Sequence, residues 1–311
     1  MQLTIEWTCV KFYFMKNYVI TTDATADYPT IFEEKDFYII PMSYVIDGTL
    51  YDDIHNKKLS SVDFFNELQS GKFSSTSMVS HDQATEFFEK LLKDGNDIIH
   101  IAFPPVLSGC YDCYLQVAEE LRVKYPERKF EVIDSRSASI GEGLLVWYAL
   151  RNRDKGASYE NELVYISDIR DNMGHIFTVD DPMHLYRGGR LKRTTAIVAK
   201  TLKIKPIITV NAIGELVQLG KVVGRKAAIN YMVDYIKANH KGKPDIIFIQ
   251  HADNLEDALA LKQKVMDLFS LPDDKVVVDF IGPIIGSHLG KGTVTMAFKS
   301  KERHPMRKFE D

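Results

Sequence analysis

Residues 97–135 read "DIIHIAFPPVLSGCYDCYLQVAEELRVKYPERKFEVIDS". The pattern of their apolar residues changes from that of a strand to that of a helix and back again. Residues 97–104 and 129–135 are apolar runs typical of buried strands, and residues 110–126 between them carry apolar side chains at helical spacing. A further helix is expected over 141–156. Strand, helix and strand in succession predict a parallel βαβ unit, in which the loops after the carboxyl ends of the strands form the site.

The same alternation continues toward the amino terminus. The expected strands there are 17–24, 37–47 and 49–53, and the expected helices are 61–71 and 81–95. Ser61 is predicted to cap the first of these helices, and Gly71 is predicted to stop it. The repeated pattern indicates one sheet with helices packed on it.

A long polar helix over 154–173 interrupts this rhythm near residue 155. The strands predicted after it are 174–179, 204–210, 245–252, 275–282 and 293–298. We therefore predict two α/β domains, the first built on a parallel sheet. The predicted bounds are an N-terminal extension at 1–14, a first domain at 15–155, and a second domain with a polar tail at 156–311. The extension is predicted because the chain from Met15 onward reads like a normal protein start.

The composition argues against several classes of protein. The 311-residue chain is 45% hydrophobic with a formal net charge of −4, so it lacks the basic field of a nucleic-acid-binding protein. No apolar run approaches the ~18 residues of a membrane helix, so we do not expect an integral membrane protein. Three cysteines, an odd number, fit a reducing cytoplasm better than a disulfide framework. The sequence predicts a globular, cytoplasmic protein.

A run of hydroxyl side chains precedes the helix predicted at 81–95. Five of the seven residues from Ser74 to Ser80 are Ser or Thr. The preference for hydroxyls at helix N-caps accounts for one of them, Ser80. Thr76 and Ser77 remain, and they could hold an anion, because the N–H groups and the dipole of a helix N-terminus favour negative charge. For this run, a structural role in the loop and a role in binding an anion are both open.

Ser108 and Gly109 follow the strand at 97–104 and open the next helix. Ser108 could be a nucleophile, but "VLSGC" lacks the leading glycine of a nucleophile elbow, so a cap or a binding role is favoured. Cys110 and Cys113 form a C-x-x-C pair at the same helix start. Redox chemistry is one interpretation of that pair, and packing of small side chains is the one we favour.

The segment "YRGGRLKR", residues 186–193, is basic. It could be a tight turn with a solvated patch, or a charged clamp on an anion or a partner. We predict that Arg187, Arg190, Lys192 and Arg193 dock a partner, since exposed charges mainly tune association. Arg190 is ambiguous because it directly follows two glycines.

"GPIIGSHLGKGT", residues 282–293, carries four glycines and a lone His288 after a predicted strand. It is not a P-loop, because Lys291 is followed by glycine rather than Ser or Thr. A histidine in such a loop favours a role in ligand binding, whereas His251 could simply cap a turn. The hydroxyls, glycines and imidazole of these motifs are neutral groups, and such groups suit recognition of a carboxylate or phosphate. We expect no catalytic residue, no metal site and no cofactor.

Seven segments in order resemble the DegV family of bacterial fatty-acid-binding proteins. They are "VITTDATADYP", "STSMVS", "VLSGCY", "VIDSRSASIGEGLLV", "YRGGRLKR", "LKIKPIITV" and "IGSHLGKGT". No single motif is decisive, but together they run from about residue 17 to residue 300, which is nearly the whole chain.

The resemblance implies two α/β domains with one long-chain fatty acid buried between them. It implies a lipid-binding carrier rather than an enzyme, which presents the carboxylate to a separate fatty acid kinase for phospholipid metabolism. By motif, the residues that bind the carboxylate correspond to Thr76, Ser108 and His288. Further candidates for the pocket or its loops are Ser77, Gly109, Gly286 and Ser287.

The flanks of these motifs depart from the family pattern, for example at Ala24, Val79 and Lys291. These departures leave chain length and ligand identity open. Two other classes of protein also stay open. One is an acyl-transfer or hydrolytic enzyme with Ser108 as nucleophile and His288 as base. The other is a kinase-like subunit that binds a sugar or a triose.

Overall fold

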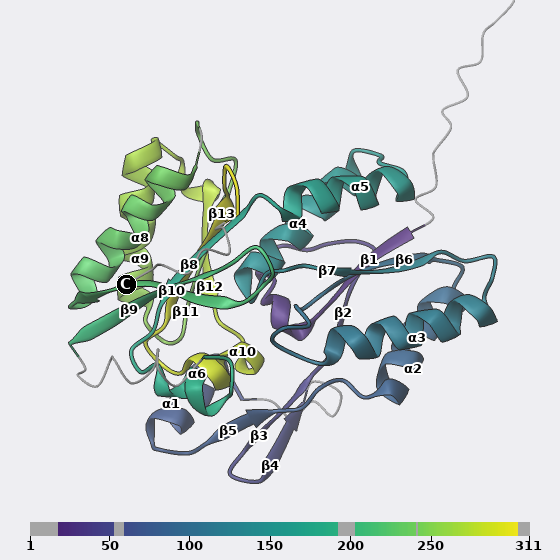
Figure 1. Cartoon of the computed structure of the whole chain (residues 1–311), viewed down its shortest axis with the longest axis horizontal. Helices are drawn as coiled ribbons and strands as arrows, with labels where there is room; N and C mark the ends of the chain where they lie inside the picture. The colour runs from purple at the N-terminus through teal and green to yellow at the C-terminus, as the bar shows by residue number, and fades with distance from the viewer. Residues whose placement is uncertain (1–17, 53–58, 192–202, 241, 304–311) are drawn as a thin grey trace, which may run out of the picture.

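The computed structural model describes residues 18–52, 59–191, 203–240 and 242–303, which form three β-sheets with helices packed on them (Figure 1). The extension predicted at residues 1–14 lies outside the described residues. No helix in the described part of the chain combines the length and the apolar character needed to cross a lipid bilayer.

The first sheet contains the predicted βαβ unit. Its strands are β1 (Tyr18–Asp23), β2 (Phe37–Ile40), β6 (Asp97–Ala102) and β7 (Phe130–Asp134). The order is β2-β1-β6-β7, and each neighbouring pair is parallel. The helix α3 (Cys110–Lys124) connects β6 to β7. The topology predicted from residues 97–135 is therefore confirmed.

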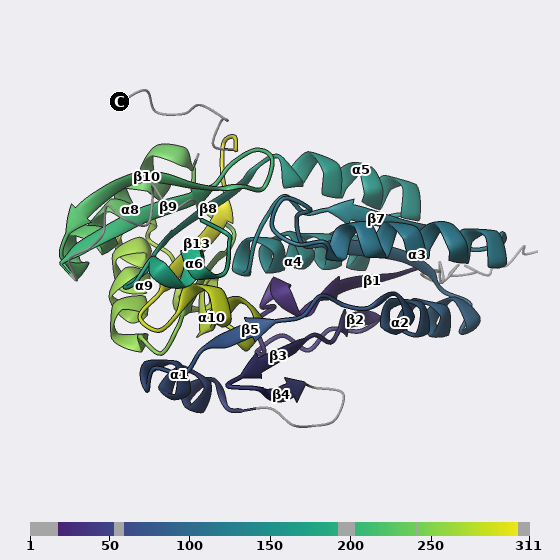
Figure 2. The same ribbon diagram turned by 60° about the horizontal axis from the view of Figure 1, so that its bottom comes forward.

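Helices cover both faces of the first sheet (Figure 2). They are α2 (His81–Lys93) and α3 on one face, and α4 (Ile140–Asp154) and α5 (Tyr159–Arg170) on the other. Val19 and Ile98 pack toward α2 and α3, whereas Ile20 and Ile99 pack toward α4. Burial on both faces explains why these strands read as continuous apolar runs. Since α5 packs on α4, the domain division at residue 155 stays a prediction.

The second sheet has six strands in the order β10-β9-β8-β13-β11-β12. They are β8 (Met173–Thr178), β9 (Ile204–Val210), β10 (Leu216–Val223), β11 (Ile247–His251), β12 (Val276–Phe280) and β13 (Val294–Lys299). Only β11 and β12 pair in parallel. The helices α8 (Arg225–Asn239) and α9 (Leu255–Phe269) cover one face. The short 3₁₀ helix η2 (Asp273–Lys275) precedes β12.

The helix α4 lies between the two large sheets, because it contacts β1 and β6 of the first and β8, β11 and β13 of the second. Leu144, Leu145 and Val146 are consecutive and all fully buried, as expected of a helix that is enclosed on every side. A Cβ on Gly143 would lie 2.5 Å from the carbonyl oxygen of Ala26, so glycine permits this close approach.

A third, antiparallel sheet lies beside the carboxyl-terminal half. Its strands are β3 (Ser43–Ile46), β4 (Thr49–Asp52) and β5 (Ser74–Thr76), and its neighbouring helices are α1 (Ser61–Gln69), α6 (Met183–Arg187) and α10 (Pro283–Leu289). The helix α10 contacts β3, β5, α1 and α6. The N-cap of α1 is Ser60, whose Oγ accepts the N–H of Asp63 at 3.1 Å, so the prediction of Ser61 is wrong by one residue.

Candidate functional site

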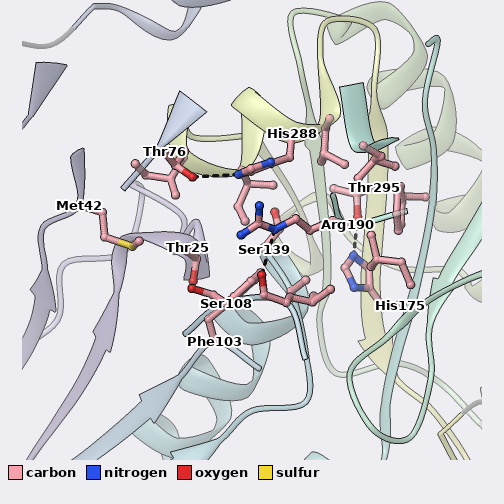
Figure 3. A pocket seen from close by; sticks show the side chains of 18 residues that line it. Thr25, Met42, Thr76, Phe103, Ser108, Ser139, His175, Arg190, His288 and Thr295 are labelled. Carbon is pink, nitrogen blue, oxygen red and sulfur yellow. Dashed lines mark hydrogen bonds between the residues drawn. The ribbon is translucent and has the colours of Figure 1, made fainter. Parts of the chain in front are cut away.

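A cavity lies where the sheets meet (Figure 3). Most of its lining side chains are apolar, namely Met42, Phe103, Leu107, Ala138, Phe177, Leu185, Leu216, Ile284, Ile285 and Leu289. An apolar cavity with a few polar groups is the usual form of a small-molecule site.

The parallel strands of the first sheet position one wall of this cavity. Thr25 lies in the 3₁₀ helix η1 (Ala24–Ala26) directly after β1, Phe103 follows β6, and Ser139 follows β7. These are the carboxyl ends of the strands, the edge at which parallel α/β folds bind ligands. The opposite wall comes from β8, β13 and α10 of the other half.

Four polar residues lie at the mouth, and each is partly exposed: Thr76, Ser108, Arg190 and His288. Thr76 Oγ1 lies 3.0 Å from His288 Nε2. The guanidinium of Arg190 is fixed by the backbone, because its Nε donates to the carbonyl of Leu107 at 3.0 Å. The mouth therefore combines two hydroxyls, an imidazole and one cation.

The charge state of the mouth follows from its burial. Desolvation, followed by the positive charge of Arg190, lowers the pKa of His288 to about 4. The imidazole is therefore neutral at pH 7. Burial also lowers the pKa of Arg190, but a guanidinium stays protonated in proteins. The net charge of these four residues is positive, which favours an anionic ligand group.

Four other polar residues line the cavity and are almost fully buried: Thr25, Ser139, His175 and Thr295. Ser139 Oγ donates to Asp27 Oδ2 at 2.6 Å. His175 Nε2 pairs with Thr295 Oγ1 at 2.8 Å.

Three buried carboxyl groups contact the hydroxyls of Thr25 and Ser139. Burial raises the pKa of Asp23 and Glu142, and it raises the pKa of Asp27 to about 7. Thr25 Oγ1 donates to Asp23, and it lies 3.1 Å from Glu142 Oε2. Asp27 additionally accepts the N–H of Gly282 at 2.9 Å. These carboxyl groups fix the hydroxyls of Thr25 and Ser139.

The other predicted pocket residues lie elsewhere in the described part of the chain. Ser77 is exposed. Ser287 is buried and pairs with Ser74 Oγ at 2.7 Å. A Cβ on Gly109 would lie 2.6 Å from Met78 Sδ, and one on Gly286 would meet phenylalanine rings at 2.9 Å. None of these four positions lines the cavity.

The basic segment divides into two parts. Arg187 is exposed, whereas Arg190 lines the cavity, and the docking role stays a prediction for both. Lys192 and Arg193 lie outside the described residues. Sequence reasoning missed Gly188, on which a Cβ would overlap His288 Nδ1.

The remaining candidates have local roles. Ser80 caps α2 by accepting the N–H of Gln83 at 3.2 Å, as predicted. His251 accepts the N–H of Asn254 at 3.2 Å, which is a turn-capping contact. Cys110 and Cys113 are free thiols, and burial raises the pKa of both, opposite to the shift of a redox nucleophile. Among the described residues, no group of three or more potential metal ligands comes together.

This fold and this cavity define a two-part α/β protein with an internal apolar cavity and a cationic mouth. The family model described as "Uncharacterised protein, DegV family" matches residues 17–301, and the chain belongs to the DegV family. A DegV domain-containing protein of Clostridium perfringens, CPE0026, is 36% identical over 94% of this chain and 100% of its own length. A Streptococcus pyogenes relative, SPs1668, is 28% identical over 90% of this chain and 96% of its own.

Solved structures share the fold. A fatty-acid-binding DegV family protein from Thermus thermophilus superposes with a TM-score of 0.81 at 24% identity, over 91% of this chain and 99% of that one. A Eubacterium eligens DegV family protein loaded with heptadecanoic acid gives 0.81 at 19% identity, over 91% and 100% of the two chains. DegV from Bacillus subtilis, a fatty acid binding protein, gives 0.77 at 23% identity, over 92% and 100%. These structures establish the two-part α/β fold.

Proposed function

We propose that this protein binds one long-chain fatty acid in the cavity and presents its carboxylate to a fatty acid kinase. The observation that carries the proposal is the form of the cavity, with an apolar lining and a mouth of neutral hydrogen-bonding groups beside one guanidinium. The ligands of the similar solved structures, which include heptadecanoic acid, support the same choice.

The apolar lining suits an acyl chain. Each buried methylene contributes about 0.8 kcal/mol, so a long chain offsets the several kcal/mol that association costs. A sugar or triose would lose its hydrogen bonds with water against walls such as Phe103, Phe177 and Ile285. The lining therefore favours a lipid over the sugar-binding alternative.

The mouth suits the carboxylate. A buried carboxylate must be hydrogen-bonded, or its desolvation cancels much of the gain from the chain. The hydroxyls of Thr76 and Ser108 and the imidazole of His288 supply hydrogen bonds, and Arg190 adds a charge-assisted one. All four are partly exposed, so a carboxylate held there is within reach of a second protein.

The same geometry favours a carrier over an enzyme. A Ser–His nucleophile needs a hydrogen bond between the two side chains. His288 Nε2 is instead paired with Thr76, and Ser108 Oγ accepts the N–H of Cys110 at 3.3 Å. As a carrier for a kinase that uses ATP, the protein would act in the cytoplasm, where its three cysteines stay reduced.

Native mass spectrometry followed by solvent extraction tests the binding step. We expect one non-covalent fatty acid per chain in protein purified from cells. Loaded protein is then incubated with ATP and the fatty acid kinase of the same organism, and hydroxylamine traps acyl phosphate as the hydroxamate. We expect hydroxamate only when all three components are present. Protein that binds no fatty acid would contradict the binding step, and loaded protein that is never phosphorylated would contradict the carrier role.

A further inference from the structure

The loop over residues 135–139 forms part of the cavity wall in a strained conformation. Ala138 and Ser139 line the cavity. Arg136 has a φ of 49°, and Ser139 has a φ of 51° with a ψ of −132°. Residues other than glycine rarely adopt a positive φ, and they keep it only where the surrounding structure fixes them. The contacts that fix this loop therefore shape the wall that meets the ligand.

The guanidinium of Arg303 contacts this loop at three points. It donates to the carbonyl oxygen of Arg136, to the carbonyl oxygen of Ser135 at 3.2 Å, and to Ser137 Oγ at 2.8 Å. Arg303 is only 7% exposed, and it follows β13 near the carboxyl terminus. A guanidinium presents its N–H donors in a fixed planar fork, so several bonds from one guanidinium hold a loop in one conformation.

The same side chain joins the loop to other elements. Its Nε donates to the carbonyl oxygen of Arg170, the last residue of α5, at 2.8 Å. Its Nη1 lies 3.4 Å from the carbonyl oxygen of Asn211, in the turn between β9 and β10. Leu216, the first residue of β10, also lines the cavity. Arg303 therefore connects two segments of the cavity wall that lie far apart in the sequence.

The charge of Arg303 is used for these contacts and not for an ion pair. Desolvation lowers the pKa of Arg303 to about 10, so the guanidinium is still protonated at pH 7. Within the described ranges its donors go to carbonyl and hydroxyl oxygens, and no carboxylate forms an ion pair with it. A buried cation is costly unless it is hydrogen-bonded. An apolar side chain would fill this space without that cost, but it would not hold the loop.

We propose that Arg303 is a positioning residue for fatty acid binding, which holds the loop over residues 135–139 in the strained form that the acyl chain packs against. The inference rests on the proposed function and adds a residue that does not touch the ligand. Arg303 does not line the cavity, so it acts through Ala138 and Ser139. Without the guanidinium the loop relaxes from its positive φ values, the wall moves, and affinity for the acyl chain falls.

Arg303→Ala tests this with palmitic acid as the probe. Calorimetric titration of delipidated protein should give a dissociation constant about tenfold or more above that of the parent, the effect of one strained residue that relaxes. Guanidinium chloride at millimolar concentration should restore part of the affinity, because the free ion can occupy the space of the lost group. The same concentration of sodium chloride should not. Guanidinium ions weaken folded proteins in general, so such a rescue is specific to the lost side chain.

Arg153→Ala is the matched control. Arg153 is 1% exposed, and its guanidinium donates to the carbonyl oxygens of Lys35 and Asp36, both at 2.5 Å. None of these three residues lines the cavity. This variant should lower the melting temperature but keep the parent affinity, with no effect of guanidinium. Ser137→Ala removes one partner of Arg303 and should weaken binding about 3- to 10-fold, so it tests the inference by itself if Arg303→Ala does not fold.

The outcomes are distinguishable. Parent affinity in both Arg303→Ala and Ser137→Ala would overturn the inference and leave the proposed function intact. So would an equal loss of affinity in Arg153→Ala, or a loss in Arg303→Ala that guanidinium does not reduce, because both would indicate general destabilisation. Failure of the parent protein to bind any fatty acid would overturn the proposed function itself.

Discussion

Thr76 and His288 are 212 residues apart in the chain, yet Thr76 Oγ1 lies 3.0 Å from His288 Nε2 (Figure 3). Thr76 ends β5, in the third sheet, and His288 lies in α10. The hydrogen bond therefore joins an amino-terminal element to a carboxyl-terminal one at the cavity mouth. This contact holds the two halves of the chain together at the mouth.

Thr76→Ala should weaken fatty acid binding by about 1–3 kcal/mol, because it removes a hydrogen-bonding group from a buried anion. Calorimetric titration of delipidated protein measures the loss, and thermal unfolding without ligand checks the fold. Ser77→Ala is the matched control, since Ser77 is the exposed neighbour. Equal affinities of Thr76→Ala and the parent protein would remove Thr76 from the site.

Gly188→Ala should lower fatty acid affinity about tenfold or more, because the added Cβ overlaps His288 Nδ1 and displaces the imidazole. The control is Gly189→Asn. Gly189 has a φ of 75° with no atom within 4 Å of a built Cβ, and asparagine tolerates that conformation. Comparable losses of affinity in both variants would show that the turn, and not His288, is responsible.

Arg190→Gln and Arg187→Glu should separate binding from docking. Arg190 lines the cavity, so its loss should weaken fatty acid binding by about 1–3 kcal/mol. Arg187 is exposed, so its reversal should leave affinity unchanged and slow kinase-dependent phosphorylation, most strongly at low salt. Loss of lipid from Arg187→Glu, with normal phosphorylation after reloading, would contradict the docking role.

Asp27 should make stability depend on pH. Burial raises its pKa from 3.8 to about 7, so between these values the folded state holds a proton that the unfolded state has lost. This contribution to the free energy of unfolding is full below about pH 4, and it declines as pH rises toward 7. The decline is at most about 4 kcal/mol.

Asp27→Asn should flatten this decline, because the amide stays neutral and its oxygen can still accept the N–H of Gly282. Melting temperatures from pH 4 to pH 8 provide the measurement. Asp168→Asn, at an exposed carboxylate, controls for the lost charge. Parallel profiles for Asp27→Asn and the parent would show that Asp27 does not titrate in this range.

The fold was predictable where the physical signal is local. The apolar runs at 97–104 and 129–135, with a helix between them, define a parallel unit because both faces of that sheet are covered. The third sheet was not predictable as a unit. Its strands β3 and β5 are short. Both contact α10, which lies more than two hundred residues later in the chain, so no local pattern separates these strands from the first sheet.

The site was predictable only in part. Hydroxyls and glycines that break a local pattern drew attention to Thr76, Ser108 and His288, and the resemblance to the DegV family assigned these residues to a carboxylate. Arg190 was placed with a docking segment, because its contact with the carbonyl of Leu107 depends on tertiary structure. His175 lies inside a strand and reads as an ordinary core residue, so its position in the cavity has no local signal.

The most direct test of a fatty acid held at this mouth is the ¹³C NMR signal of bound palmitic acid labelled at its carboxyl carbon. We predict one sharp bound resonance that differs from that of free palmitate, does not titrate like an acid in water, and shifts in both Thr76→Ala and His288→Ala. A bound resonance that titrates as in water, or that is identical in the parent and in both variants, would contradict it.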